Sequence, residues 1–198
     1  VFDQFEDLSY NRPKFDASTV WNSNGITTQY NTGRTTNGIY IWENDNINFT
    51  KKINTNQLTQ LSIFVTSNGD IYTTSTNTPF TINRWLSNET NTSATIAYSD
   101  GDLDGIFIDI NNTLYFSSTY KHQVLSKPLS FIKSLSSSSN ILTIVAGTGV
   151  AGNASNMLHN PFGLFVDVNF DLYVADWGNH RIQLFRQGQQ NAITVMDN

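Results

Sequence analysis

Short runs of β-branched and aromatic residues, separated by turns rich in Asn, Gly and Asp, recur along most of the chain. Three segments share one layout: LSIFVTSNGDIYTTSTNTPFTINRWL from Leu61, DGIFIDINNTLYFSSTYKHQVLS from Asp104, and FGLFVDVNFDLYVADWGNHRIQLF from Phe162. Each has three apolar runs joined by a turn and a polar loop, which predicts three strands in hairpins. A fourth run follows each copy, as SATIAY, ILTIVAG or AITVMD. Four antiparallel strands per repeat, without helical periodicity, predict the blades of an all-β β-propeller.

Aromatic residues recur at matching strand positions of the three copies. Propeller sheets are covered on both faces by neighbouring blades, so their strands carry nearly continuous apolar runs. We therefore interpret the recurring aromatics as core residues and not as a binding site. They are Phe64, Phe107 and Phe165, with Tyr72, Tyr115 and Tyr173.

The region before the first full copy is too short for another complete blade. Tyr40 precedes Phe64 by about 24 residues, whereas a four-stranded blade needs about 40–45. We interpret GIYIWENDN as a third strand and INFTKKI as a fourth, with remnants of an earlier blade in VWNSNGITTQY. The serine-rich stretch SKPLSFIKSLSSSSN predicts a mobile surface loop. The predicted divisions are a divergent segment at 1–38, a partial blade at 39–60, and near-complete blades at 61–103, 104–160 and 161–198.

Composition narrows the classes of partner. Apolar residues make up 38% of the chain and charged residues 14%, as in globular proteins. The 11 basic and 16 acidic residues give a net charge of -5, which disfavours nucleic acid and anionic membranes as partners. No apolar run approaches the ~20 residues of a membrane helix, and no cysteine is present to form disulfides or thiolate metal sites.

Composition leaves the cellular compartment open. Five Asn-X-Ser/Thr sequons are about as many as chance gives in a chain this rich in Asn, Ser and Thr. We favour an extracellular compartment over the cytoplasm, although no motif decides between them. The sequons begin at Asn48, Asn88, Asn91, Asn111 and Asn153.

The last copy resembles an NHL repeat. The resemblance rests on Pro161 and Gly163 at the start, on Val166-Asp167, on the Leu-Tyr-Val-Ala-Asp run 172–176, and on Asn-His-Arg-Ile at 179–182. The middle copy has Lys121-His122-Gln123 in place of the Asn-His-Arg triplet, and the first copy has lost it. The resemblance is specific over about 141–198 and weaker over 39–140.

The resemblance implies an NHL-type propeller, usually six-bladed, whose loops on one face bind other molecules. Members include tripartite-motif ubiquitin-ligase scaffolds, some of which bind RNA, bacterial sensor domains, and the lyase half of the peptide-amidating enzyme. About three blades and part of a fourth are fewer than the roughly 4–8 of a closed ring. We therefore expect a fragment or an incomplete six-bladed propeller, which further blades or a second copy would close.

The segment DWGNHR places an acid, a histidine and an arginine within six residues. We interpret Asp176, His180 and Arg181 as structural, with Asp176 accepting hydrogen bonds from loop amides. Arg181 is expected to reach an acid, for which the neighbouring blade is a candidate. Trp177 at the tip of this loop is a candidate binding anchor, unless its ring folds over the next blade.

We predict a non-catalytic scaffold that binds a protein or small ligand through loops on one face. The binding residues proposed are His159, Asn160, Trp177 and Asn179. A propeller enzyme related to the amidating lyase is an alternative, but its zinc needs histidines that His122, His159 and His180 do not match in position. The substrate-recognition part of a tripartite-motif-like ubiquitin ligase is another, with its catalytic region outside this chain.

The segment SDGDLDG suggests a calcium site. Asp100, Asp102 and Asp104 alternate and are followed by Gly105, as in the first half of a calcium-binding loop. Position twelve would be Asn111 in place of glutamate, which excludes an EF-hand. The alternatives are a smaller propeller-loop Ca²⁺ site and a solvated acidic turn.

Overall fold

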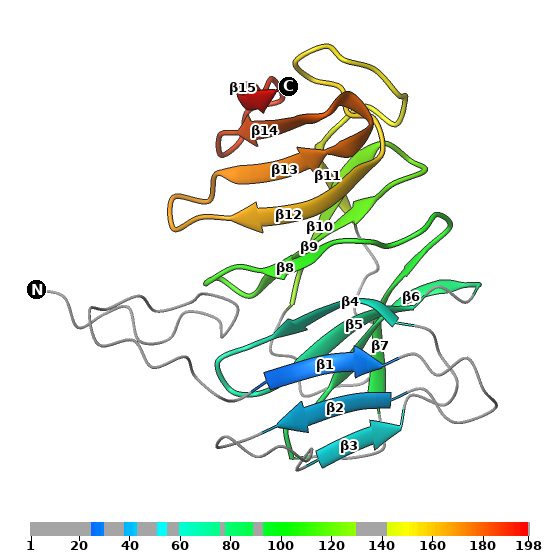
Figure 1. Cartoon of the computed structure of the whole chain (residues 1–198). Helices are drawn as coiled ribbons and strands as arrows, with labels where there is room; N and C mark the ends of the chain where they lie inside the picture. The colour runs from blue at the N-terminus through cyan, green and yellow to red at the C-terminus, as the bar shows by residue number, and fades with distance from the viewer. Residues whose placement is uncertain are drawn as a thin grey trace, which may run out of the picture. The chain divides into compact units, whose positions relative to one another are not determined.

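The computed structural model describes residues 25–29, 38–42, 51–54, 60–75, 78–88, 93–129 and 142–197 (Figure 1). The chain divides into two compact units, 1–98 and 99–198. Strands dominate both units, and η1 (Trp177–Asn179), a single 3₁₀ turn, is the one helical element within these ranges. The all-β prediction is confirmed. Within the same ranges, no helix has the length and apolar character needed to cross a bilayer.

The first unit contains two sheets. The smaller has the order β1-β2-β3, formed by β1 (Gly25–Gln29), β2 (Gly38–Trp42) and β3 (Lys51–Asn54). The larger is a meander of four strands in the order β4-β5-β6-β7. Its strands are β4 (Gln60–Val65), β5 (Ile71–Ser75), β6 (Phe80–Trp85) and β7 (Ser93–Ser99).

The meander β4–β7 is held by buried aromatic residues and by a braced turn. Phe64 and Tyr72 are opposite one another on β4 and β5, and both are buried as predicted. The buried indole of Trp85 donates to Thr73 Oγ1 at 3.1 Å. Asp70, at the turn before β5, accepts hydrogen bonds from the backbone N–H of Ser87 and from Arg84 Nε, both at 3.0 Å. One carboxylate therefore fixes where β5 begins and where the chain leaves β6.

The second unit contains two four-stranded meanders of the same plan. The first comprises β8 (Ile106–Ile108), β9 (Thr113–Ser118), β10 (Gln123–Pro128) and β11 (Thr143–Ala146). The second comprises β12 (Pro161–Val166), β13 (Leu172–Asp176), β14 (Arg181–Phe185) and β15 (Ile193–Asp197). The fourth apolar run of each copy forms the fourth strand, as the sequence pattern predicts.

These two meanders pack on one another through a shared apolar core. Phe107 and Phe165 meet edge to face with ring centroids 5.2 Å apart, and both are partly buried. The hydroxyl of Ser117 donates to Phe162 O across the interface at 2.5 Å. Phe107 and Tyr115 pack against the shared core, whereas all four recurring aromatics of this unit are only partly buried, unlike Phe64 and Tyr72 in the first unit. The core that joins the two sheets consists of Val124, Ala146, Leu158, Val166, Leu172, Val174 and Phe185.

The turn after β14 repeats the bracing seen in the first unit. Asp171 precedes β13 as Asp70 precedes β5, and it accepts from the backbone N–H of Gln187 at 3.0 Å. The same contact therefore sets strand ends in the first and the last copies.

Several predictions concern residues outside the described ranges. These include most of the N-terminal segment 1–38, residues 130–140 of the serine-rich stretch, and two of the sequons, Asn48 and Asn91. The first residues of that stretch, Ser126–Pro128, belong to β10, and Ser126 and Lys127 are buried, so the predicted loop begins too early. Asn88, Asn111 and Asn153 are exposed. The predicted blade boundaries and the glycosylation of these asparagines stay predictions.

Candidate functional site

The loop between β13 and β14 is a tight, well-braced corner. Residues 177–179 form η1, and the turn closes when the N–H of His180 donates to Trp177 O. His180 has φ 54°, in the left-handed region that few residues other than Gly, Asn and Asp enter readily. Its backbone closes the turn, while its side chain is exposed.

Asp176 anchors this corner from a fully buried position. Its side chain accepts from the backbone N–H of His159 at 2.6 Å, from Asn179 Nδ2 at 2.8 Å and from Arg181 Nε at 2.7 Å. A carboxylate with no exposed surface needs such partners, because burying an unpaired charge is costly. The structural role predicted for Asp176 matches these contacts.

Arg181 differs from the expectation in which acid it reaches. Its ion pair is with Asp176 on its own blade and not with a residue of the neighbouring blade. Its other N–H groups donate to the carbonyls of Asn153 at 2.8 Å, and of Ala154 and Met157 at 3.1 Å. Arg181 therefore links the loop that enters the blade to the corner of the same blade. The spacing of residues along the sequence does not show whether its partner lies on its own blade or on the neighbouring one.

The entry loop and the corner lie against each other. The N–H of Gly178 donates to His159 O at 2.8 Å, and a Cβ at Gly178 would lie 2.7 Å from that oxygen. Only glycine allows this approach without displacing one of the loops. Asn179 Nδ2 also donates to Gly152 O at 2.8 Å. The structure thus brings together the four predicted binding residues, although the amide of Asn179 is used to hold the loops.

A second histidine, His122, joins this group from the β9–β10 loop. Its ring lies 5.7 Å from that of His159, centroid to centroid, and its Nδ1 accepts from the N–H of Asn160 at 3.1 Å. Burial and the neighbouring His159 lower the pKa of His122, and the negative charge of Asp176 opposes them. Sequence reasoning considered His122 as a departure from the Asn-His-Arg triplet and as one of three histidines poorly placed for zinc, and it missed the place of His122 beside the entry loop.

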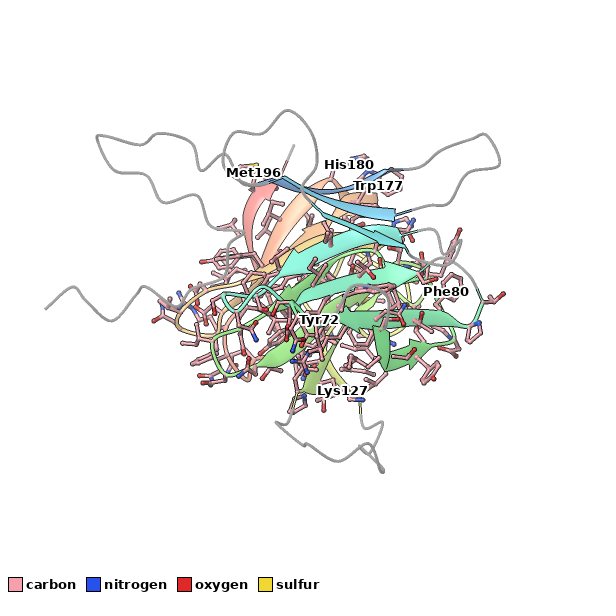
Figure 2. The ribbon with its side chains drawn as sticks, turned by 90° about the horizontal axis from the view of Figure 1, so that it is seen from below. Tyr72, Phe80, Lys127, Trp177, His180 and Met196 are labelled. Atoms are coloured by element: carbon pink, nitrogen blue, oxygen red, sulfur yellow. The ribbon has the colours of Figure 1, made fainter. Side chains whose placement is uncertain are left out.

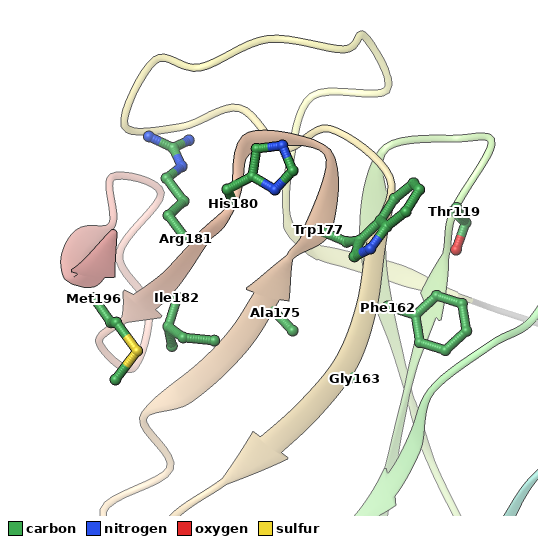
Figure 3. Close-up of a pocket in the computed structure, with 9 residues that line it drawn as sticks. All are labelled: Thr119, Phe162, Gly163, Ala175, Trp177, His180, Arg181, Ile182 and Met196. Carbon is green, nitrogen blue, oxygen red and sulfur yellow. The ribbon is translucent and has the colours of Figure 1, made fainter. Parts of the chain in front are cut away.

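Trp177 is the exposed member of the group. Its side chain is 64% exposed, so it is not folded under a neighbouring blade in this structure. It lines a shallow groove of about 670 Å³ with Thr119, Phe162, Gly163, Ala175, His180, Arg181, Ile182 and Met196 (Figure 3). In Figure 2, Trp177 and His180 lie beside one another, and Met196, which lines the same groove, lies further along the same side of the view. Most of this lining is apolar, and the aliphatic part of it was not predicted, because apolar positions on strands indicate core.

The three aspartates of the SDGDLDG segment contact other groups of the chain. Asp100 is exposed and pairs with Lys121 Nζ at 2.9 Å, while Asp102 accepts from the N–H of Tyr120 at 2.9 Å. Asp104 is buried and contacts the hydroxyl of Thr119. The three carboxylates therefore have separate partners, all three from the β9–β10 loop, which the local spacing did not reveal.

Burial contributes most to the raised pKa of Asp102, the Tyr120 N–H opposes it, and Asp104 adds to it. Across the ranges that the structure describes, no group of three or more His, Cys, Asp or Glu side chains could hold a metal ion.

Comparison with solved structures finds a similar fold. A crystal structure of a nidogen/laminin complex matches with a TM-score of 0.57 and 14% sequence identity. The match covers 79% of this chain and 54% of that chain, so the present chain spans about half the length of its structural neighbour. No family model matches the sequence, and no curated protein does. The meanders described above and this likeness establish that the chain has an all-β, β-propeller fold.

Proposed function

We propose that the chain is a non-catalytic, NHL-type propeller scaffold that binds a protein partner through the loop end of its last blade. The loop end is the group formed by His159, Asn160, Trp177 and Asn179. Trp177 would make the central contact, and the other three would fix the loops around it.

The observation that carries this proposal is the exposed indole on a rigid turn. Tryptophan is enriched among residues that dominate protein interfaces, because it buries a large area at a small cost in conformational entropy. The turn below Trp177 is held by Asp176 through three hydrogen bonds. A partner would therefore meet a side chain whose backbone is already fixed, which lowers the cost of binding.

The engagement of the polar groups supports a binding role over a catalytic one. A general base needs a free lone pair within reach of a substrate proton. Here Asp176 is enclosed and accepts from three donors, and His122 Nδ1 accepts from the backbone of Asn160. These groups hold loops together. A lyase-type propeller would instead contain a metal, so elemental analysis of the purified protein tests that alternative.

The preference for a protein partner has separate support. The similar structure is that of a nidogen/laminin complex, so a protein with this fold is found there in a complex between proteins. The net charge of -5 argues against nucleic acid as the partner. The Asn-His-Arg triplet at 179–181, which suggested an NHL repeat, contributes Asn179 and Arg181 to the bracing of the loop end.

The test is selection from a displayed peptide library against the wild-type protein, followed by affinity measurements on the Trp177→Ala variant. Truncating a central tryptophan should weaken binding by about 2–4 kcal/mol, or about 30-fold to 1,000-fold. Tyr98→Ala, which removes another exposed aromatic ring, is the matched control and should leave the affinity unchanged.

The melting temperature separates the binding role from a packing role. Because the indole is largely exposed, Trp177→Ala should leave it nearly unchanged. A large loss of stability, or full-strength peptide binding by the variant, would contradict the proposal.

A further inference from the structure

One hydrogen bond joins two successive blades of the second unit at the loop end. His122 belongs to the turn between β9 and β10, and its Nδ1 accepts from the backbone N–H of Asn160, in the entry loop of the next blade, at 3.1 Å. A backbone nitrogen can only donate, so Nδ1 must offer a lone pair and the ring must be neutral, with its proton on Nε2. This hydrogen bond, which we call the interblade contact, therefore exists in one protonation state of His122 only.

The backbone of His122 is fixed independently of its ring. Its N–H donates to Thr119 O at 3.2 Å, and its φ of 52° is close to the 54° of His180, which holds the same place before β14. Gly147 packs so closely on this turn that a Cβ there would lie 2.2 Å from His122 O. Because the turn is rigid, a change in the charge of the ring acts mainly on the entry loop that faces it.

The entry loop connects the interblade contact to the turn that carries Trp177. His159, the neighbour of Asn160, accepts from the N–H of Gly178 in that turn at 2.8 Å. The N–H of His159 donates in turn to Asp176 at 2.6 Å. Three contacts thus hold these two residues of the entry loop, and the imidazole is the member of the three whose ordinary pKa lies close to neutrality.

Two titratable groups face the His122 ring from other elements. The ring of His159, in the entry loop, lies 5.7 Å away between centroids, and Asp176 lies at the end of β13. Burial and His159 lower the pKa of His122, and the charge of Asp176 opposes them. The surroundings therefore favour the neutral ring that the interblade contact requires.

The other charged groups near this turn have partners of their own. The segment 147–152, which packs on the turn through Gly147, has no charged side chain. The charged groups with partners are Lys121 and Asp100, which pair with each other, and Asp102, Asp104 and Arg181.

We propose that His122 makes the loop end sensitive to pH: the neutral ring holds Asn160, and the protonated ring releases the entry loop, so that the partner binds more weakly in mild acid. This inference rests on the proposed function and adds its regulation. A protonated ring carries N–H on Nδ1, opposite the N–H of Asn160, and two donors cannot share a hydrogen bond. The turn of Trp177 would then lose part of the support that fixes it before binding.

The direction of the effect follows from the interblade contact. The closed entry loop requires the neutral ring, whereas the released loop lets the ring take up a proton, so a fall in pH below the ordinary histidine value of 6.5 favours release. Asp176 and Gly178 still hold His159 after release. We therefore expect coupling at the lower end of the usual range, with binding about fivefold weaker at about pH 5.5 than at about pH 7.5.

Amide hydrogen exchange, measured by NMR on the protein without a partner, tests the interblade contact directly. The protection of the Asn160 N–H, expressed relative to the intrinsic exchange rate at each pH, should fall between about pH 7.5 and 5.5. The fall should follow the titration of His122, recorded from its own ring protons. The N–H of Gln187, which donates to Asp171 at the opposite end of the blade, is the control and should keep its protection.

A peptide selected at about pH 7.5, and without titratable side chains of its own, measures the effect on binding. The wild type should show the fivefold loss of affinity in acid. His122→Asn keeps the left-handed turn, because Asn enters this conformation readily, but it cannot take up the proton, so its affinity should depend little on pH. His180→Asn removes a histidine from the equivalent turn position and should retain the wild-type ratio of the two affinities.

Two results would overturn the proposal: an Asn160 N–H that stays equally protected when His122 is protonated, or the same dependence on pH in His122→Asn as in the wild type. Circular dichroism at both pH values confirms that the variants are folded, and the exchange measurement on the wild type needs no variant. Failure to select any peptide at about pH 7.5 would count against the proposed function alone, and exchange at Asn160 would then decide the role of His122.

Discussion

Replacing Asp176 with alanine should destabilise the last blade more than any other single change in its loops. The substitution removes the acceptor for His159 N–H, Asn179 Nδ2 and Arg181 Nε at once. The Arg181 side chain is only 12% exposed, so its guanidinium would lose its counter-ion in a place that water reaches poorly.

The expected cost follows from this burial. Breaking a buried ion pair by removing one partner typically costs about 3–5 kcal/mol, because the remaining charge is left without compensation. The three carbonyls that also bind Arg181 favour the lower end of that range. For a chain of this size, such a loss corresponds to a decrease in melting temperature of roughly 6–20 °C.

Urea denaturation, followed by both tryptophan fluorescence and circular dichroism, measures the loss and reveals whether the two units unfold together. Asp176→Asn retains the shape and one acceptor oxygen, so its stability should fall between those of the wild type and Asp176→Ala. Asp100→Ala is the control, because the Asp100–Lys121 pair is exposed and its loss should leave the unfolding midpoint unchanged. A cost below about 1 kcal/mol for Asp176→Ala would refute the role assigned to this carboxylate.

Two further predictions concern the same loops. The pKa of His122 lies below its ordinary value of 6.5, so the unfolded state takes up a proton first as the pH falls. The contribution of His122 to stability should therefore be full above about pH 7 and decline as the pH falls through 6.5. Urea midpoints between about pH 7.5 and 5.5 should decrease less for His122→Asn than for the wild type, and equal slopes would contradict this. Gly178→Ala should cost about 1–3 kcal/mol in the same assay, because its Cβ would meet His159 O, and an unchanged midpoint would show that the loops separate freely.

The sequence predicted the repeated elements well because their signals are local. Alternating apolar runs and turn residues lie within a few positions of one another, and Phe107 and Phe165 recur at matching places because both fill the core between sheets. The corner at Asp176 and Arg181 was also identified, since both residues belong to one short loop.

The remaining features depend on contacts between residues far apart in the chain. In the sequence, Asp100 and Asp102 resemble part of a calcium-binding loop. In the structure they contact Lys121 and Tyr120 of the β9–β10 loop. The acid that Arg181 reaches could not be assigned from spacing, because residues of both its own and the neighbouring blade were plausible. The sequence analysis did not single out Met196 within its strand, and only the structure shows that its side chain is exposed.

The bracing by Asp70 and Asp171 is common to the first and the last copies, although these two copies differ at the triplet. Both carboxylates accept from the backbone where the chain leaves the third strand, in the first and the last copies. The first copy has lost the Asn-His-Arg triplet at the opposite end of the blade, yet β4–β7 retains its four-stranded order. The four-stranded order therefore does not depend on the triplet, so the triplet end can change in sequence while the braced turn keeps the strand ends in place.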